Sequence, residues 1–586
     1  MNRRTMMRTE ISLNGIWKFA PTHDQHPTNN QNTEAGIPLY AHPRLDRSDW
    51  ENVSVPGVWQ RYREVYRLYE GVCWFVREFE VDSTDGLTNA KLHFGGVNYR
   101  ADVYLNGQYV GTHESGYTPF SFDVTGCLTA GRNTIAVQVD NRPLTVKWPN
   151  DWGYGVFGGI HRDVTLELCY GAYLSGVELT PDYDVNNDRA LLHVRGTLNG
   201  ETEDPVTVRL NGQRQTLTAE QGVFDETLTF DGILPWSPTT PILYELSVSV
   251  CGVTFRQESL GFRHPECHAR QILLNGEQIH LNGACYVYDS PEFGLVMDER
   301  QLTADLRKMK DAHINAIRTH YPMDRRFYEL CDRMGFLVWI EPNVYCSKPD
   351  NREANTVFAR PDYVDNAVQM VREMICEARS HASVMIYGIG NECNVNHPEA
   401  FPFFQTLPQT IRDTDRTRPI GYASLYGDLG EIGALVDIMG VNAYYGWYGT
   451  FPTFETDEEK QNGVIRTPEL TDLHAMLDRV KDALPADTPI LMTEFGADSV
   501  PGYHSEKKAL WSEEYHAALL TQTVTELMDR SDIAGQFVFA FTDYDDPSKP
   551  KNGHWNGLNL KGLLAYDRAE KAPYEAIREI YGKTNR

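Results

Sequence analysis

The chain has 586 residues and a formal net charge of −27, from 54 Lys and Arg against 81 Asp and Glu. Its length suggests about three or four domains, and a composition of 41% hydrophobic and 23% charged residues is typical of a folded globular protein. The acidity argues against nucleic acid as a partner, because a phosphate backbone needs concentrated Lys and Arg.

No stretch approaches ~18 uninterrupted apolar residues, and the basic opening MNRRTMMR has no apolar run behind it. We therefore expect no signal peptide and no membrane span. Ten cysteines are scattered between Cys73 and Cys393 without a Cys-x-x-Cys pair. This spread is typical of reduced thiols, so we expect a cytoplasmic protein.

Residues 1–170 are expected to form an all-β sandwich. Strand-like runs at 92–94 and 101–105 precede Asn106-Gly107, after which another run covers 109–111. Asn-Gly accepts the positive φ angles of a type I′ turn, so this pattern predicts a β-hairpin.

Residues 171–263 continue in the same style. A second Asn-Gly turn, Asn211-Gly212, lies between strand-like runs at 206–210 and 215–218. A β-domain of about 90 residues has the size of an immunoglobulin-like sandwich. We therefore expect a second β-domain.

From residue 264 to 586, short apolar runs alternate with amphipathic helical patterns. Leu302, Leu306, Met309 and His313 share one face of a helix predicted to begin near Asp298. Eight strand-like runs over about 320 residues match the count and length of a TIM barrel. The runs are 279–283, 316–320, 336–341, 384–390, 420–424, 436–442, 490–494 and 535–541.

Two glutamates stand at the ends of these runs, where a TIM barrel places its reacting groups. The fourth run leads to Asn391-Glu392 and the seventh ends at Glu494. Glycoside hydrolysis needs one carboxyl group to protonate the leaving oxygen and another to meet the oxocarbenium-like carbon from the opposite face. A separation of ~5–5.5 Å would indicate a retaining mechanism through a covalent glycosyl-enzyme. The alternative is that each glutamate is only a polar residue at a strand end.

These motifs, behind two β-sandwiches, resemble glycoside hydrolase family 2 over nearly the whole chain. The resemblance implies a jelly-roll domain at 1–170, an immunoglobulin-like domain at 171–263 and a catalytic (β/α)8 TIM barrel at 264–586. It also implies functional roles for three residues at the barrel mouth. These are Glu392 as the acid/base, Glu494 as the nucleophile and Asn391 as a partner of the sugar 2-hydroxyl.

Within that family the chain most resembles the β-glucuronidases of the gut-bacterial type, which carry an Asn-x-Lys motif after the eighth strand. Here Asn559-Leu560-Lys561 stands at that position. The resemblance implies that Asn559 and Lys561 grip the sugar carboxylate. Electrostatics agrees, since on a protein of charge −27 an anionic sugar needs a local cation and hydrogen-bond donors.

The same resemblance covers the run 442–448, which contains four aromatic residues. It implies that Tyr444 bonds the nucleophile and that Tyr448 approaches the sugar carboxylate. Tyr445 and Trp447 are interpreted as barrel packing.

Two more positions follow from the resemblance, and Arg318 is expected beside them on electrostatic grounds. His320, at the end of the second run, is implied to contact the sugar, and Asp151 is implied to reach into the cleft from the first domain. Arg318 is expected to contact the nucleophile and hold it ionised, as a cation within ~4–6 Å would.

The chain also departs from the glucuronidase pattern. Many of those enzymes have Arg where this chain has Trp555, and Trp where it has Phe539. With one cation fewer near the sugar carboxylate, the expected preference for a uronic acid is weaker. Which epimer is accepted stays open. The segment 343–358 is modest in length, so we expect no extended lid. The site should be relatively open, with an aglycone pocket partly formed by neighbouring loops or subunits.

The other motifs do not indicate a functional site. Gly388-Ile389-Gly390 lacks the third glycine of a dinucleotide fingerprint. The His and Cys residues at 264–268 fall at a domain junction and are not expected to hold a metal. Cys393 is interpreted as a packed thiol. We expect neither a metal nor another cofactor.

The leading hypothesis is a retaining exo-β-glucuronidase that acts on small-molecule or oligosaccharide β-glucuronides. The family suggests a homo-oligomer, either a dimer or a tetramer. The alternatives are a β-galacturonidase or β-galactosidase of the same family, and a non-catalytic carbohydrate-binding protein. The presence of Glu392, Glu494 and Asn391 disfavours the last alternative. The natural aglycone stays open.

Overall fold

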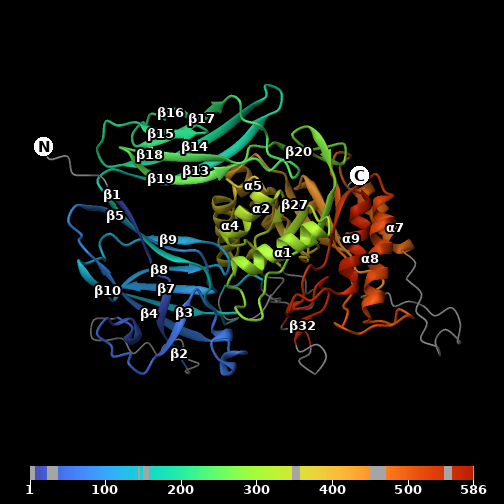
Figure 1. The fold of residues 1–586 in the computed structure, drawn as a ribbon, viewed down its shortest axis with the longest axis horizontal. Helices are drawn as coiled ribbons and strands as arrows, with labels where there is room; N and C mark the ends of the chain where they lie inside the picture. The colour runs from blue at the N-terminus through green and yellow to red at the C-terminus, as the bar shows by residue number, and fades with distance from the viewer. Residues whose placement is uncertain are drawn as a thin grey trace.

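The structure is a computed structural model, and it describes residues 7–22, 37–142, 146–149, 157–345, 357–448, 470–546, 549 and 557–584. Figure 1 shows a β-region in blue, a second β-region in teal to green above it, and a barrel with its helices in yellow-green to red beside both. The predicted class, two β-sandwiches followed by a TIM barrel, is confirmed.

The first β-region contains a four-stranded sheet of order β1-β12-β5-β9 and a six-stranded sheet of order β3-β2-β4-β10-β7-β8. One cluster of buried apolar side chains, from Leu13 to Leu168, joins strands of the two sheets. The strands are β1 Met7–Ser12, β2 Gly15–Thr22, β3 Glu51–Val55, β4 Val72–Val81, β5 Leu87–Phe94, β6 Val97–Asn98, β7 Arg100–Leu105, β8 Gln108–Glu114, β9 Phe120–Asp123, β10 Gly131–Asp140, β11 Gly159–Ile160 and β12 Val164–Tyr170. Short 3-10 helices are η1 Leu39–Ala41, η2 Trp59–Arg61 and η3 Glu64–Tyr66.

The second β-region has a three-stranded sheet of order β13-β14-β17 and a four-stranded sheet of order β16-β15-β18-β19. Its buried apolar side chains form a separate cluster from Leu174 to Phe262. The strands are β13 Tyr173–Asp184, β14 Arg189–Asn199, β15 Val206–Leu210, β16 Gln213–Leu217, β17 Val223–Phe230, β18 Tyr244–Val250 and β19 Val253–Leu260.

Both predicted Asn-Gly hairpins are confirmed. Asn106 and Gly107, with φ of 53° and 80°, join β7 to β8. Asn211 and Gly212, with φ of 47° and 79°, join β15 to β16. Positive φ at both central residues is the requirement of a type I′ turn, whose twist matches the flanking strands.

Eight parallel strands then close into a barrel, as the spacing of the apolar runs predicts. A small antiparallel sheet of β20 Pro265–His268, β21 Gln271–Leu274 and β22 Glu277–Ile279 precedes it, and the pair β31 Tyr544–Asp545 and β32 Leu558–Asn559 follows it. The barrel strands are β23 Leu281–Cys285, β24 Ala316–Thr319, β25 Leu337–Ile340, β26 Val384–Asn391, β27 Ile420–Leu425, β28 Ile438–Asn442, β29 Ile490–Glu494 and β30 Ile533–Val538.

Helices cover the outside of the barrel. The α-helices are α1 Glu299–Asp311, α2 Arg325–Met334, α4 Pro361–Ala378, α5 Ala400–Thr414, α7 Thr471–Ala483, α8 Glu513–Met528 and α9 Ala572–Thr584, and the 3-10 helices are η4 Val357–Ala359 and η5 Ile432–Ala434. Between β27 and β28 the connection contains only η5. The last barrel strand ends at Val538, before the predicted end, because the backbone N–H groups of Phe539 and Ala540 bond outside the regular strand pairing. Phe539 donates to the carbonyl of Phe495 and Ala540 to that of Lys561.

Helix α1 explains one wrong assignment. The Asp298 side chain caps its first turn by accepting from the backbone N–H of Gln301, and Leu302, Leu306 and Met309 are buried as predicted. His313 is exposed instead, because the helix ends at Asp311 and His313 takes a positive φ of 59°. The periodic pattern therefore ends one turn earlier than the sequence indicates.

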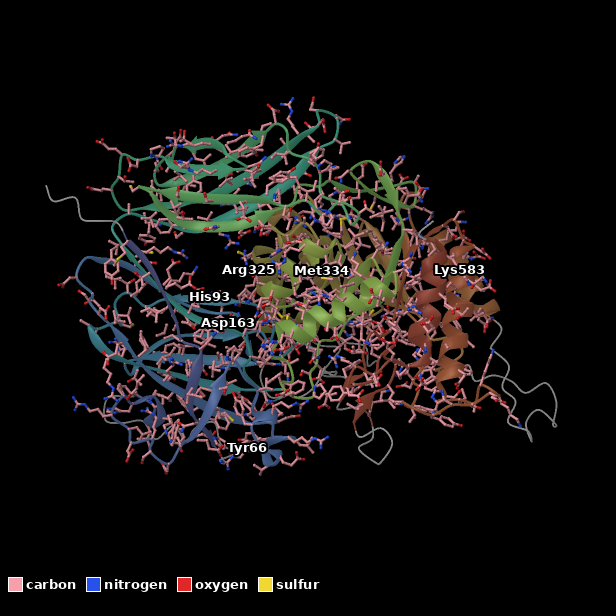
Figure 2. All side chains as sticks on the ribbon, viewed as in Figure 1. Tyr66, His93, Asp163, Arg325, Met334 and Lys583 are labelled. Atoms are coloured by element: carbon pink, nitrogen blue, oxygen red, sulfur yellow. The ribbon has the colours of Figure 1, made fainter. Side chains whose placement is uncertain are left out.

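The first β-region is bonded directly to the barrel. His113 Nε2 lies 3.0 Å from both carboxylate oxygens of Glu373 on α4, and Arg162 donates to the carbonyl oxygen of Pro322 at 2.6 Å. Asp163 lies at the same junction, where Figure 2 labels it, with Oδ1 3.9 Å from an Arg326 nitrogen. The Arg162 contact seats the first β-region beside the loop that follows β24.

Candidate active site

The predicted catalytic residues come together at one end of the barrel. Asn391 and Glu494 are the last residues of β26 and β29, and Glu392 follows Asn391 directly. Arg318 lies within β24, and His320 follows that strand. Because all eight strands run parallel, their C-terminal ends meet at the same face, and residues far apart in sequence become neighbours.

Glu494 is buried and accepts hydrogen bonds from several sides. Arg318 donates to its Oε1 at 2.7 Å, His320 Nε2 lies 2.8 Å from the same oxygen, and Tyr444 donates to Oε2 at 2.6 Å. Burial alone would raise the pKa of Glu494, but the hydrogen bond with His320, the charge of Arg318 and the Tyr444 hydroxyl together lower it to about 2. Glu494 is therefore ionised at neutral pH.

Glu392 has the opposite electrostatic environment. Asn442 donates to its Oε1 at 2.8 Å. Burial, followed by the nearby negative charge of Glu494, raises the pKa of Glu392 to about 8, although the hydrogen bond from Asn442 acts in the opposite direction. Two carboxyl groups whose pKa values are separated in this way suit one residue to donate a proton while the other attacks as a carboxylate.

The pocket predicted to hold a sugar carboxylate lies next to Glu494. Lys561 is only 1% exposed, and its ammonium group donates to the Tyr448 hydroxyl at 2.6 Å. The rings of Tyr448 and Tyr444 are 5.2 Å apart, and Tyr444 donates to Glu494. A cation, two phenols and Glu494 thus form one connected chain of contacts.

Both donors of the Asn-x-Lys motif also contact carboxylates of the chain itself. Lys561 Nζ lies 2.5 Å from Asp498 Oδ2, and Asn559 donates to Asp546 Oδ2 at 3.2 Å. Burial alone would raise the pKa of Asp498, but the charges of Lys561 and Lys549 outweigh it and lower the pKa to about 2. Asp498 is therefore ionised and neutralises part of the positive charge of Lys561.

Three sequence interpretations concern residues around this pocket. Phe539 packs edge-on against the rings of His320 and Tyr444, at 5.7 and 6.3 Å, and so forms an apolar wall. Tyr445 packs edge-on against Tyr426, and Trp447 against Trp511. Trp447 also lies 5.9 Å from Lys561 Nζ, so it takes part in the pocket as well as in packing.

Some predicted positions lie outside the described residues, namely Asp151, Trp555 and most of the segment 343–358. The segment just before Asp151 is described, and it docks on the barrel. The Trp148 carbonyl oxygen accepts from Asn343 Nδ2 at 3.1 Å, and its indole N–H donates to the Tyr363 carbonyl oxygen at 3.2 Å. The chain of the first β-region therefore reaches the barrel close to the end of β25.

Sequence reasoning missed three buried residues of the site. Asn442, the last residue of β28, donates to both Asn391 Oδ1 and Glu392 Oε1. Glu341 pairs with Arg318, and Asp498 pairs with Lys561. All three stand at or just after strand ends, so a search for every polar residue at those positions would have found them.

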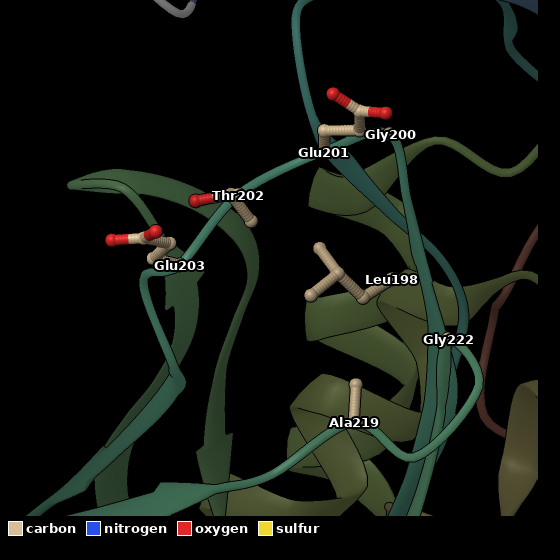
Figure 3. A pocket seen from close by; sticks show the side chains of 7 residues that line it. All are labelled: Leu198, Gly200, Glu201, Thr202, Glu203, Ala219 and Gly222. Carbon is tan, nitrogen blue, oxygen red and sulfur yellow. The ribbon is translucent and has the colours of Figure 1, made fainter.

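The remaining candidate sites carry little chemistry. No group of residues suited to hold a metal occurs in the described part of the chain, and His264 Nδ1 pairs with Asp182 at 2.9 Å. Cys393 is buried, with its thiol 3.5 Å from the Asn391 carbonyl oxygen. Figure 3 shows a shallow hollow on the second β-region, where Glu201 and Glu203 are exposed and no lining residue is aromatic or cationic. That hollow offers no ring on which a sugar could stack and no cation for a sugar carboxylate.

Family models match most of the chain. Residues 266–585 match the model described as "Glycosyl hydrolases family 2, TIM barrel domain", and residues 11–169 match "Glycosyl hydrolases family 2, sugar binding domain". The chain belongs to glycoside hydrolase family 2 and is a glycoside hydrolase.

The curated relatives include β-glucuronidases and β-galactosidases. A β-glucuronidase of Paenibacillus borealis is 26% identical over 99% of this chain and 98% of its own length. A β-galactosidase of Vibrio vulnificus is 28% identical over 70% of this chain, but the match spans only 42% of that longer protein.

Solved structures align over the full length. A family 2 β-galacturonidase from Eisenbergiella tayi bound to galacturonate is 25% identical, with a TM-score of 0.81 and 99% of each chain covered. A Faecalibacterium prausnitzii β-glucuronidase is also 25% identical, with a TM-score of 0.80, and covers 100% of this chain and 99% of its own.

Proposed function

We propose that this glycoside hydrolase is a retaining exo-β-glucuronidase that releases terminal β-D-glucuronic acid from small-molecule or oligosaccharide β-glucuronides. The observation that carries the proposal is the connected set Lys561, Tyr448, Tyr444 and Glu494. It sets a buried cation and hydroxyl donors beside the residue that would attack the anomeric carbon. The full-length likeness to the Paenibacillus borealis β-glucuronidase supports the same substrate class.

Two steps make up the proposed reaction. Glu494 attacks the anomeric carbon as a carboxylate, the bond to the aglycone oxygen breaks, and Glu392 gives its proton to that oxygen. Glu392, now ionised, then takes a proton from water, which attacks the anomeric carbon and releases Glu494. Asn391 is positioned to bind the sugar 2-hydroxyl, an interaction that strengthens in the transition state.

A separate observation bears on the alternative substrates. Lys561 is partly neutralised by Asp498, and Asn559 already contacts Asp546. A second carboxylate from the sugar has to share these donors, which favours a neutral β-galactoside. A galacturonide carries the same carboxylate as a glucuronide and differs from it at C4, so these contacts do not separate the two uronides. The β-galacturonidase from Eisenbergiella tayi and the β-galactosidase relatives make these the sugars to test.

A panel of p-nitrophenyl β-glycosides tests the proposal. The glucuronide should be the best substrate, and Lys561→Ala should lower its kcat/KM roughly 10- to 100-fold, because one charge-assisted hydrogen bond is lost. The neutral glucoside should change much less. Lys310→Ala is the matched control, since Lys310 donates to the Gly335 carbonyl oxygen at 2.8 Å and does not belong to the Asn-x-Lys motif.

The panel also separates the alternatives. Equal losses on glucuronide and glucoside in Lys561→Ala would contradict uronate recognition. Faster turnover of the galacturonide would replace the glucuronidase assignment with a galacturonidase one.

We also propose a cytoplasmic location. No disulfide joins the nine cysteines within the described residues, as is typical of a reducing compartment. No helix in the described ranges is both long and apolar enough to span a bilayer. Fractionation of the source cells, with activity measured in each fraction, tests the location.

A further inference from the structure

Arg318 links three residues of the site, because its guanidinium donates hydrogen bonds to Glu494, Asn391 and Glu341. Its guanidinium is fully buried. One terminal nitrogen donates to Glu494 Oε1 at 2.7 Å, and the other donates to Asn391 Oδ1 at 2.8 Å. A guanidinium is a rigid planar fork with five N–H donors, so fixing one edge of it fixes the direction of the others.

Glu341 holds the remaining edge of that fork. Its two carboxylate oxygens accept from Arg318 Nε at 2.8 Å and from a terminal nitrogen at 3.1 Å. Glu341 directly follows β25, which pairs with the strand of Arg318, and it is 1% exposed. This bidentate pair sets the plane in which Arg318 reaches Glu494 and Asn391.

The neighbouring strand leaves room for the Glu341 side chain. A Cβ atom at Gly388 of β26 would lie 2.4 Å from Glu341 Cγ and 2.6 Å from Trp339 Nε1. The Arg318 guanidinium lies 5.8 Å from the Trp339 ring centre. Packing, and not nucleotide binding, therefore explains the glycine at position 388. Any side chain there would displace the carboxylate that orients Arg318.

The proposed reaction changes the charge of this cluster. When Glu494 attacks, its carboxylate becomes an ester with the anomeric carbon, the bond to the aglycone oxygen breaks, and the proton of Glu392 passes to that oxygen. Glu494 loses its negative charge and Glu392 gains one, whereas Arg318 stays positive. A buried charge without a counter-ion is strongly destabilising. Glu341 is the carboxylate that stays directly hydrogen-bonded to Arg318 at that stage.

We infer that Glu341 is a positioning residue: it orients Arg318 toward Glu494 and Asn391 and remains the counter-ion of Arg318 in the glycosyl-enzyme. This inference rests on the proposed function in taking Glu494 as the nucleophile, but it holds whichever sugar the enzyme prefers. Removing the carboxylate leaves Arg318 free to tilt, which moves the nucleophile and the 2-hydroxyl partner together.

Glu341→Gln tests the inference with the aryl β-glycoside that the wild type hydrolyses fastest. We expect kcat to fall about 100-fold, as for a misplaced catalytic group, while KM changes less than about threefold. The preference for that substrate over its 2-deoxy analogue should also shrink, because Asn391 loses its orientation. A purely structural role would leave this preference unchanged.

Two further variants complete the design. Gly388→Ala keeps the Glu341 carboxylate but displaces it, and should reproduce both effects even if Glu341→Gln fails to fold. Asp415→Asn removes the charge from another buried pair, Asp415 with Arg418 at 2.6 Å, and should lower stability without changing the 2-deoxy preference.

The outcomes separate the inference from the proposed function. If Glu341→Gln or Gly388→Ala folds and keeps the wild-type kcat and 2-deoxy preference while Glu494→Ala is inactive, the inference is wrong and the nucleophile assignment stands. If Glu494→Ala also keeps its activity, the proposed function itself fails.

Discussion

Glu392 and Glu494 are the same residue type at the ends of two strands of one barrel, yet their surroundings move their pKa values in opposite directions. Both lose solvation by burial. Glu494 gains Arg318, His320 and Tyr444 as partners, and its pKa falls to about 2. Glu392 faces the negative charge of Glu494, and its pKa rises to about 8.

Local donors and charges, and not burial alone, therefore separate the pKa values of the two glutamates. A carboxyl group that has to donate a proton needs few donors and a negative neighbour, whereas one that has to attack needs several donors. Several experiments test this contrast between Glu392 and Glu494.

The largest effect is expected from Glu494→Ala. Without the carboxylate no glycosyl-enzyme can form, so kcat on an aryl β-D-glucuronide should fall by ~10⁴-fold or more. Steady-state kinetics measure it. Glu258→Ala, which removes a buried glutamate paired with Arg256 and Arg325 outside the barrel mouth, should keep its kcat if the protein folds. Unchanged turnover in Glu494→Ala would end the assignment.

A somewhat smaller loss is expected from Glu392→Gln, which removes the proton donor but leaves the nucleophile. The rate should fall by ~10²- to 10⁴-fold for glycosides with poor leaving groups, and much less for activated aryl glycosides that leave without protonation. A series of substituted phenyl glycosides measures this slope. A loss independent of the leaving group would mean that Glu392 is not the acid.

Tyr444→Phe should have an intermediate effect. It removes one donor from Glu494 and raises the pKa of that carboxyl toward its usual range, so kcat should fall roughly 10- to 100-fold. The matched control is Tyr445→Phe, which removes the hydroxyl of the adjacent tyrosine that packs on Tyr426. Equal losses in the two variants would contradict a special role for Tyr444.

The smallest effects concern pH. Activity should fall as pH rises through about 8, because ionised Glu392 cannot protonate the leaving group. The folded-state pKa of Glu392 is raised from 4.5, so its contribution to the free energy of unfolding is present at low pH and is lost as pH rises through about 8.

Glu392→Gln cannot ionise, so its Tm should exceed that of the wild type by a few degrees at pH 8 and by less at pH 5. Melting curves at the two pH values measure this difference. A difference independent of pH would show that Glu392 does not carry the raised pKa.

Much of this architecture was predictable because it depends on local patterns. The Asn106-Gly107 and Asn211-Gly212 turns follow from backbone conformations that few other residue pairs accept. The eight alternating runs imply a barrel, and a barrel implies that Glu392 and Glu494 share one face. His313 was assigned wrongly because nothing in its periodicity shows that the helix stops before it.

Local sequence patterns thus predicted the domain classes, the barrel and the pair of glutamates at its mouth. The family resemblance implied which of the two is the acid. The opposite pKa shifts of the two glutamates appear only in the folded protein, since they depend on donors at the ends of β24 and β28 and on charges brought close by barrel closure. The same holds for Glu341 and Asp498. Their partners, Arg318 and Lys561, are 23 and 63 residues away along the chain, and no local pattern records such a pairing.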